Sequence, residues 1–104
     1  MAFRNDIENK LKVYDSIYFY TKNVFNSIVE ELQATGISVE LDDKYVDSFT
    51  LVFDSGKNYP CFEIEIDYSQ IISELKKTSS KLVTLEKEKV DTVIRDLVLN
   101  KMPV

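Results

Sequence analysis

Carboxylates at alternating positions are the side chains in this sequence whose type and spacing suggest chemistry. The segment 61–67 reads CFEIEID, so that Glu63, Glu65 and Asp67 share one face of an extended chain while its apolar side chains occupy the other. Neighbouring carboxylates on that face lie about 6.5–7 Å apart, and phosphates along a nucleic-acid strand are spaced on a similar scale. Such a row can attract a basic partner, ligate a divalent cation, or supply an acid/base pair.

The residue composition argues against the last two possibilities. The chain has no histidine and one cysteine, Cys61, so it lacks the commonest general base and the usual zinc ligands. Its two glycines cannot form a phosphate-binding loop or a dinucleotide fingerprint. Calcium or magnesium needs converging oxygen ligands, whereas side chains along one strand diverge, and a flat sheet face has no cleft to bury a catalytic carboxylate pair. We therefore expect no enzymatic activity, no bound metal and no cofactor.

Acidic residues are concentrated in the middle third of the chain. The net charge is −5, and residues 36–68 contain eight acidic residues against two lysines. No basic stripe with interleaved aromatic residues occurs, so direct binding of nucleic acid is not expected. The charge is explained either by a solvated face that discourages pairing of strand edges or by a surface that binds a basic partner. The eight acidic residues are Glu40, Asp42, Asp43, Asp47, Asp54, Glu63, Glu65 and Asp67.

The length of 104 residues is that of a single domain, and we expect residues 1–104 to form one. No apolar run approaches the about 20 residues of a membrane span, and the first ten residues, MAFRNDIENK, lack the apolar core of a signal peptide. A single cysteine cannot form an internal disulfide. We therefore expect a cytoplasmic protein with no membrane partner.

Hydrophobic periodicity predicts the elements that position the acidic residues. Residues 3–35 have apolar side chains at steps of three, four or seven, which predicts one long helix that ends at Gly36. Alternation over 37–41, 48–53 and 61–67, with short connections, predicts a three-stranded antiparallel meander. Residues 68–100 read as two helices separated by TSSKLV, with Thr84 as the second N-cap, or alternatively as one helix. The order αβββαα describes an α+β domain with its helices packed on one face of the sheet.

The long helix raises a question of fit. At 1.5 Å per residue it is about 48 Å long, whereas a seven-residue strand is about 23 Å. The helix must therefore bend near residues 21–23, or one of its ends must overhang the sheet. Phe19 departs from the apolar pattern and lies among polar positions, so it is either an isolated exposed aromatic residue or an anchor for a partner or a second copy.

Taken together, the αβββαα layout and the acidic segment 40–67 resemble the small phage-encoded inhibitors of CRISPR nucleases, the anti-CRISPR proteins. Immunity proteins that neutralise nuclease toxins share the same general features. The resemblance rests on layout and charge and on no residue motif. It implies that the eight acidic residues of the middle third contact Lys and Arg of a basic nuclease, in the manner of a DNA mimic. Tyr45, Tyr59 and Tyr68 lie near these acids in the sequence and are candidates for aromatic contacts.

Two functional hypotheses follow from the sequence. The first is an acidic protein inhibitor that binds a basic partner, such as a nucleic-acid-binding nuclease, through the sheet face and its loops. The second is a structural or adaptor module that self-associates as a homodimer through the long N-terminal helix and Phe19.

Overall fold

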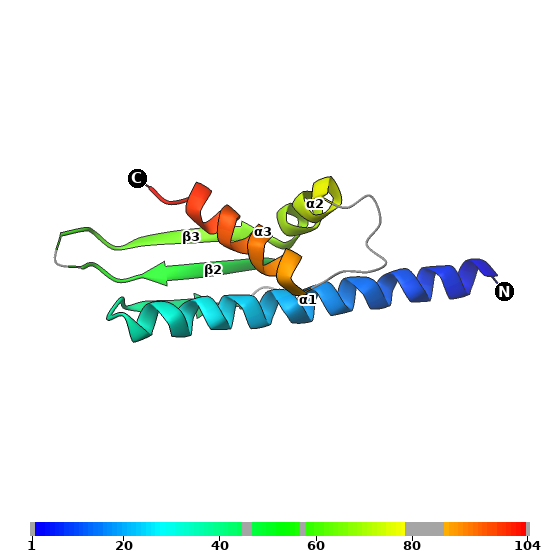
Figure 1. Cartoon of the computed structure of the whole chain (residues 1–104), viewed down its shortest axis with the longest axis horizontal. Coiled ribbons are helices and arrows are strands. Elements are labelled where there is room, and N and C mark those ends of the chain that lie inside the picture. The colour runs from blue at the N-terminus through cyan, green and yellow to red at the C-terminus, as the bar shows by residue number, and fades with distance from the viewer. Residues whose placement is uncertain (1, 45–46, 57, 79–86, 104) are drawn as a thin grey trace.

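The computed structural model describes residues 2–44, 47–56, 58–78 and 87–103. The order of elements is αβββαα, as the sequence predicts, and the fold class is α+β (Figure 1). The elements are α1 (Ala2–Ala34), β1 (Val39–Asp42), β2 (Ser48–Phe53), β3 (Phe62–Asp67), α2 (Tyr68–Thr78) and α3 (Lys87–Asn100).

The strands form one antiparallel sheet in the order β1-β2-β3. Their register aligns Val39 with Phe53, and it places Leu51 between Leu41 on β1 and Ile64 on β3. Because side chains alternate along a strand, this register collects the apolar residues on one face, as parity predicts.

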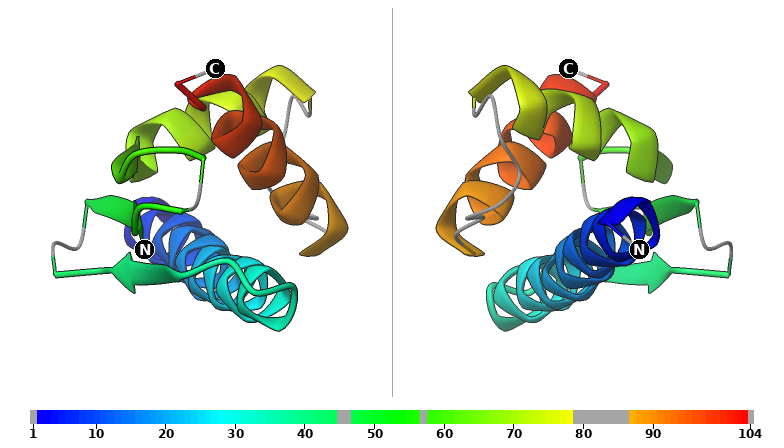
Figure 2. Two further views of the ribbon diagram at one scale, coloured as in Figure 1. Left: turned by 90° about the vertical axis from the view of Figure 1, so that its left-hand side faces the viewer. Right: turned by 90° about the vertical axis from the view of Figure 1, so that its right-hand side faces the viewer.

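Helices α1 and α3 cover the apolar face, and Figure 2 shows both on the same side of the strands. The rings of Phe25 on α1 and Phe49 on β2 stack with their centroids 4.9 Å apart, and both residues are fully buried. Arg95 of α3 also donates to Glu31 of α1 across the surface at 2.8 Å. The opposite face of the sheet carries the exposed carboxylates of β1 and β3.

The turn from α1 into β1 explains the difference between the predicted and observed start of the first strand. Gly36 has a φ of 89°, and its N–H donates to the carbonyl of Gln33. The N–H of Ile37 donates to the carbonyl of Leu32. These two bonds form a Schellman motif that closes the helix. Ile37 therefore belongs to the helix cap, and β1 begins at Val39 rather than at residue 37.

The long helix overhangs the sheet, which is one of the two predicted alternatives, and α1 is one continuous helix through residues 21–23 (Figure 1). Thr21 is buried at this point of the helix, and its hydroxyl donates to the carbonyl of Ile17 at 2.7 Å. Residues 2–12 of α1 are all exposed, and Figure 1 shows this end projecting beyond the other elements. The overhang contributes to the long dimension of a molecule that measures 59 × 25 × 21 Å.

The described residues of the C-terminal part form two separate helices, α2 and α3, which pack against each other. The single continuous helix that the sequence also allowed is therefore wrong. The amide of Asp67 donates to Oε1 of Gln70 at 3.0 Å, which begins α2 directly after β3. Most of the predicted break TSSKLV, and the predicted cap at Thr84, lie outside the described residues. Among the helices described, none combines the length and apolar character needed to cross a membrane.

Candidate partner-binding surface

The face of the sheet opposite the core is lined by carboxylates on its two outer strands. In the observed register, Val52 lies between Glu40 and Glu63. In the next row along the strands, Thr50 lies between Asp42 and Glu65. We use the name acidic sheet face for the five exposed carboxylates of β1 and β3, which are Glu40, Asp42, Glu63, Glu65 and Asp67.

The spacing of this array follows from sheet geometry. Strands lie about 4.7–4.9 Å apart, so the two acidic strands are separated by roughly 9.5 Å across the neutral strand β2. Along each strand the carboxylate positions repeat at about 6.5–7 Å. The result is two parallel acidic rows with the uncharged residues Thr50 and Val52 between them.

The carboxylates of the acidic sheet face have no cationic partner among the described residues. The ion pairs found in the described parts of the chain involve other side chains. Lys101 lies near β3, where its ammonium group donates to the backbone carbonyl of Glu65 at 2.7 Å and to Oε1 of Gln70 at 3.0 Å. Neither acceptor is a carboxylate. The like charges are therefore held side by side on an exposed surface.

The other three predicted acidic residues occupy different surroundings. Asp54 accepts a hydrogen bond from the Ser38 hydroxyl at 2.7 Å, which places it at one end of the acidic sheet face. Asp43 forms an ion pair with Lys22 of α1 at 3.5 Å, so it is directed toward the helix layer. Asp47 lies in the corner before β2, where its carbonyl accepts the amide of Tyr68.

The predicted aromatic contacts are only partly available. The sequence makes Tyr68 a candidate contact, but its side chain is directed into the molecule. Its ring packs edge-on against Tyr18, and its hydroxyl donates to the carbonyl of Tyr14 at 2.6 Å. Tyr59 is 41% exposed and packs against Phe62 near the β2–β3 turn. Tyr45 lies outside the described residues. Phe19 is exposed, but it belongs to α1, which covers the opposite face of the sheet.

The environment of Tyr68 makes stability sensitive to alkaline pH. Burial, followed by the nearby Asp15, raises the pKa of Tyr68 from 10.0 to about 12. The folded state thus retains a proton that the unfolded chain loses above pH 10, so this contribution is fully present below pH 10 and is lost as pH rises through about 12. Two pH units correspond to about 2.7 kcal/mol, and partial solvent screening reduces the expected loss to about 1–2 kcal/mol.

The measurement is urea unfolding at several pH values from 8 to 12, for the wild type and Tyr68→Phe. The substitution keeps the ring contact with Tyr18 and removes the titrating hydroxyl. We expect a smaller loss of stability across this range in Tyr68→Phe. An identical pH dependence in both proteins would assign the alkaline transition to other groups.

In the described ranges, no group of three or more Asp, Glu or Cys side chains is arranged to hold a metal ion. Comparisons of the chain with protein-family models, with curated proteins and with solved structures give no match. The arrangement of side chains on the molecule itself is therefore the basis for a functional proposal.

The sequence pattern did not identify one surface that the structure reveals. Phe3, Ile7 and Leu11 follow the apolar periodicity that predicts the first helix, but they lie on the overhang and are exposed. The sequence contains one indication of this surface, which is the difference in length between the first helix and the strands. Because the helix is longer than the sheet that it covers, one of its ends can lie beyond the sheet.

Proposed function

We propose that this protein is a non-enzymatic inhibitor that binds a basic partner, namely a nucleic-acid-binding nuclease, through the acidic sheet face. The observation that carries the proposal is the pair of acidic strands on a sheet face that none of the described helices covers, with carboxylates that form no ion pair within the described residues. A surface intended only for solubility usually mixes charges of both signs.

The physical basis of binding is electrostatic complementarity. A cluster of like charges creates a potential that speeds association with an oppositely charged surface, and salt weakens this attraction. The carboxylate repeat along each strand is on the scale of the phosphate repeat that the Lys and Arg side chains of a nuclease groove recognise. The neutral centre at Thr50 and Val52 permits close approach without further charge repulsion.

The resemblance in layout and charge to anti-CRISPR proteins supports a nuclease as the partner. Inhibition follows from occupancy, because a protein bound in the basic groove excludes the nucleic acid that would otherwise bind there. Asp54 extends the acidic sheet face at one end. Phe19 and Asp43 belong to the helix side and are not required for this contact.

A lysine placed between the acidic rows is expected to weaken partner binding without destabilising the fold. Loss of binding can therefore be distinguished from misfolding. Thr50→Lys sets a cation beside Asp42 and Glu65, where cross-strand pairs of opposite charge contribute about 0.2–1 kcal/mol each. We expect unchanged or increased stability in urea unfolding, together with weaker retention of the basic partner. The protein is immobilised, incubated with a lysate of its natural host, and eluted in salt steps with identification by mass spectrometry.

The control is Ser27→Lys, which adds the same charge at an exposed position of α1 on the other side of the molecule. The control is expected to retain the partner at the same salt concentration as the wild type. If Thr50→Lys also retains it unchanged, the acidic sheet face is not the binding surface. If the captured protein shows undiminished nuclease activity in the presence of excess wild type, the protein is a binder without inhibitory function.

A further inference from the structure

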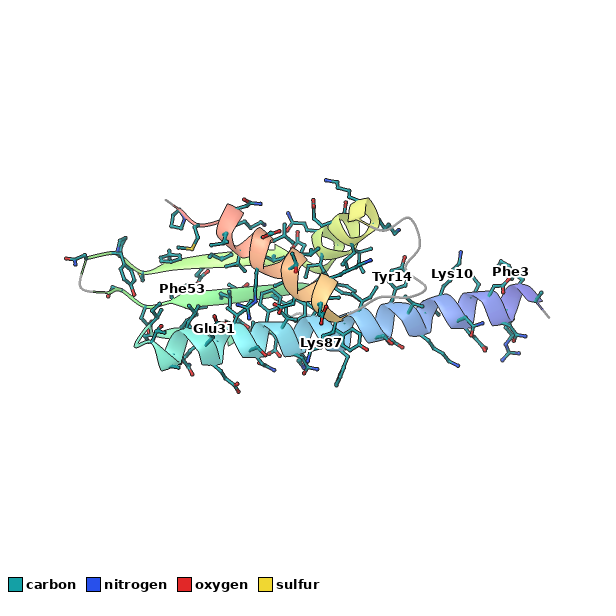
Figure 3. The ribbon with its side chains drawn as sticks, in the orientation of Figure 1. Phe3, Lys10, Tyr14, Glu31, Phe53 and Lys87 are labelled. Atoms are coloured by element: carbon teal, nitrogen blue, oxygen red, sulfur yellow. The ribbon has the colours of Figure 1, made fainter. Side chains whose placement is uncertain are left out.

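The overhanging part of α1 carries an apolar stripe with no partner among the described residues. Phe3, Ile7 and Leu11 recur every four residues and are 78%, 44% and 55% exposed. Figure 3 shows the neighbouring positions Phe3, Lys10 and Tyr14 projecting from the same side of the helix, the side on which the body of the molecule lies. The stripe thus continues along the face that α1 uses for its own packing.

The spacing of this stripe is that of a helix-packing seam. From Ile7 onward the residues on this side alternate at steps of four and three, the spacing by which two helices interlock side chains. The later members of the series pack in the core of the molecule, and the first members project beyond it. The series is Ile7, Leu11, Tyr14, Tyr18, Thr21, Phe25, Ile28 and Leu32.

We propose that the overhang is a homodimerisation element in which residues 2–12 of two copies pack antiparallel, with Ile7 on the two-fold axis. A parallel partner is excluded by shape. In each copy the sheet and the helices α2 and α3, together called the body, lie on this side of α1 from about Tyr14 onward (Figure 1). In a parallel pair the two bodies would therefore occupy the same space. In the antiparallel pair the bodies lie at opposite ends.

The antiparallel register follows from the extent of the exposed segment. Residue 7 is the midpoint of residues 2–12, so centring the pair there matches the two overhangs along their whole length. Phe3 of one copy then lies level with Leu11 of the other, and Ile7 lies opposite its own copy. All three exposed apolar side chains are covered in both copies, which is the pattern of a self-complementary two-fold interface.

The charges beside the stripe are complementary in this register. In an antiparallel pair each flank of one helix faces the same flank of the other. Lys10 and Asp6 occupy one flank, and Arg4 and Glu8, which form an ion pair at 3.2 Å, occupy the other. Across the axis, Lys10 lies within two residues, about 3 Å along the helix, of Asp6 from the second copy. Arg4 has the same relation to Glu8. Each flank therefore contains two contacts between opposite charges and one between like charges, since Asp6 and Glu8 each lie at the same two-residue offset from their own copies.

The size of the interface sets the expected affinity. A helix pair of 11 residues is about 15 Å long and buries less than the about 1,200 Å² of standard protein interfaces. We therefore expect dimerisation with a dissociation constant on the order of micromolar, visible as a concentration dependence. This interface is on a different element from the acidic sheet face, so the proposal is independent of nuclease binding.

Sedimentation velocity of the full chain between 1 and 200 μM tests the proposal. The wild type is expected to move from the monomer mass of 12.1 kDa toward twice that value as concentration rises. Ile7→Glu sets two carboxylates against each other on the axis and is expected to remain monomeric throughout. Phe19→Glu introduces the same charge at another exposed position of α1, and it is expected to dimerise like the wild type. Circular dichroism verifies that both variants fold.

A charge exchange tests the pairing of the flanks. Lys10→Glu places acidic groups opposite Asp6 of the second copy and is expected to weaken dimerisation several-fold. The double variant Asp6→Lys/Lys10→Glu exchanges the two charges and is expected to restore it. Equal weakening by the single and double variants would overturn the proposed register.

Cross-linking tests the orientation in a Cys61→Ser background, since Cys61 is exposed. Ile7→Cys is expected to form a disulfide between copies under mild oxidation, because residue 7 meets its own copy on the axis. Phe3→Cys is not expected to do so, because its copy lies eight residues, about 12 Å, away along the helix. Efficient cross-linking of both would indicate a parallel pair. A wild type that stays monomeric at 200 μM, or that binds lipid vesicles instead of dimerising, would overturn the proposal.

Discussion

Phe49→Ala is expected to destabilise the fold by about 3–5 kcal/mol, which is the usual cost of removing a buried phenylalanine from a core. Phe49 is fully buried on the central strand, where its ring stacks on Phe25 of α1 and contacts Tyr18. The substitution therefore opens a cavity at the junction between the sheet and the long helix. Since small proteins have a total stability of about 5–15 kcal/mol, this loss removes a large part of it.

Urea unfolding followed by circular dichroism measures this effect. Phe19→Ala is the matched control, because it makes the same chemical change at a ring that is 63% exposed. The control is expected to change the unfolding free energy by no more than about 0.5 kcal/mol. Similar losses in both variants would mean that the stack between Phe25 and Phe49 does not have the importance that its burial indicates.

Reversing two charges on β3 is expected to have the largest effect on partner binding. Glu63→Lys/Glu65→Lys changes the net charge by +4, from −5 to −1, and sets two cations against the basic surface of the partner. Juxtaposed like charges cost several kcal/mol, and each 1.4 kcal/mol is a factor of ten in affinity. We expect binding to the identified partner to weaken at least about 100-fold, with the fold retained because both side chains are exposed.

The control for this pair separates local from global charge. Glu30→Lys/Asp96→Lys also changes the net charge by +4, but at exposed positions of α1 and α3 on the opposite side of the molecule. Titration calorimetry at two salt concentrations compares the two double variants. The control is expected to lose only a small part of the affinity, through weaker long-range attraction. Equal losses would indicate that net charge alone governs binding.

The elements of the fold were largely predictable because their periodicities are long and uninterrupted. The first helix differs from its predicted bounds by one residue at each end, and β2 matches them. The start of β1 was not predictable by alternation, because Ile37 fits the strand pattern equally well but contributes its amide to the helix cap. The side-chain pattern is equally compatible with Ile37 in the strand and with Ile37 in the helix cap, and its hydrogen bond to Leu32 places it in the cap.

The candidate surface was predictable for residues whose face is set by alternation along a strand. It was not predictable for residues whose side chains contact parts of the chain that are distant in sequence. Glu63 and Glu65 lie on the predicted face because alternation along a strand leaves no other choice. The role of Tyr68 depends on the carbonyl of Tyr14, which is 54 residues away in the chain. Similarly, the periodicity around Ile7 identifies an apolar face but contains no information on whether another element covers it.

The direct passage from β3 into α2 has a consequence for how the molecule opens. The first amides of a helix are commonly unpaired and fray. Here the amide of Asp67 is bonded to Gln70, and the amide of Tyr68 to the carbonyl of Asp47 in the corner before β2. Unwinding the first turn of α2 therefore requires the edge of the sheet to separate as well. We therefore expect β2, β3 and α2 to form one cooperative unit whose amides open together, which hydrogen exchange can measure.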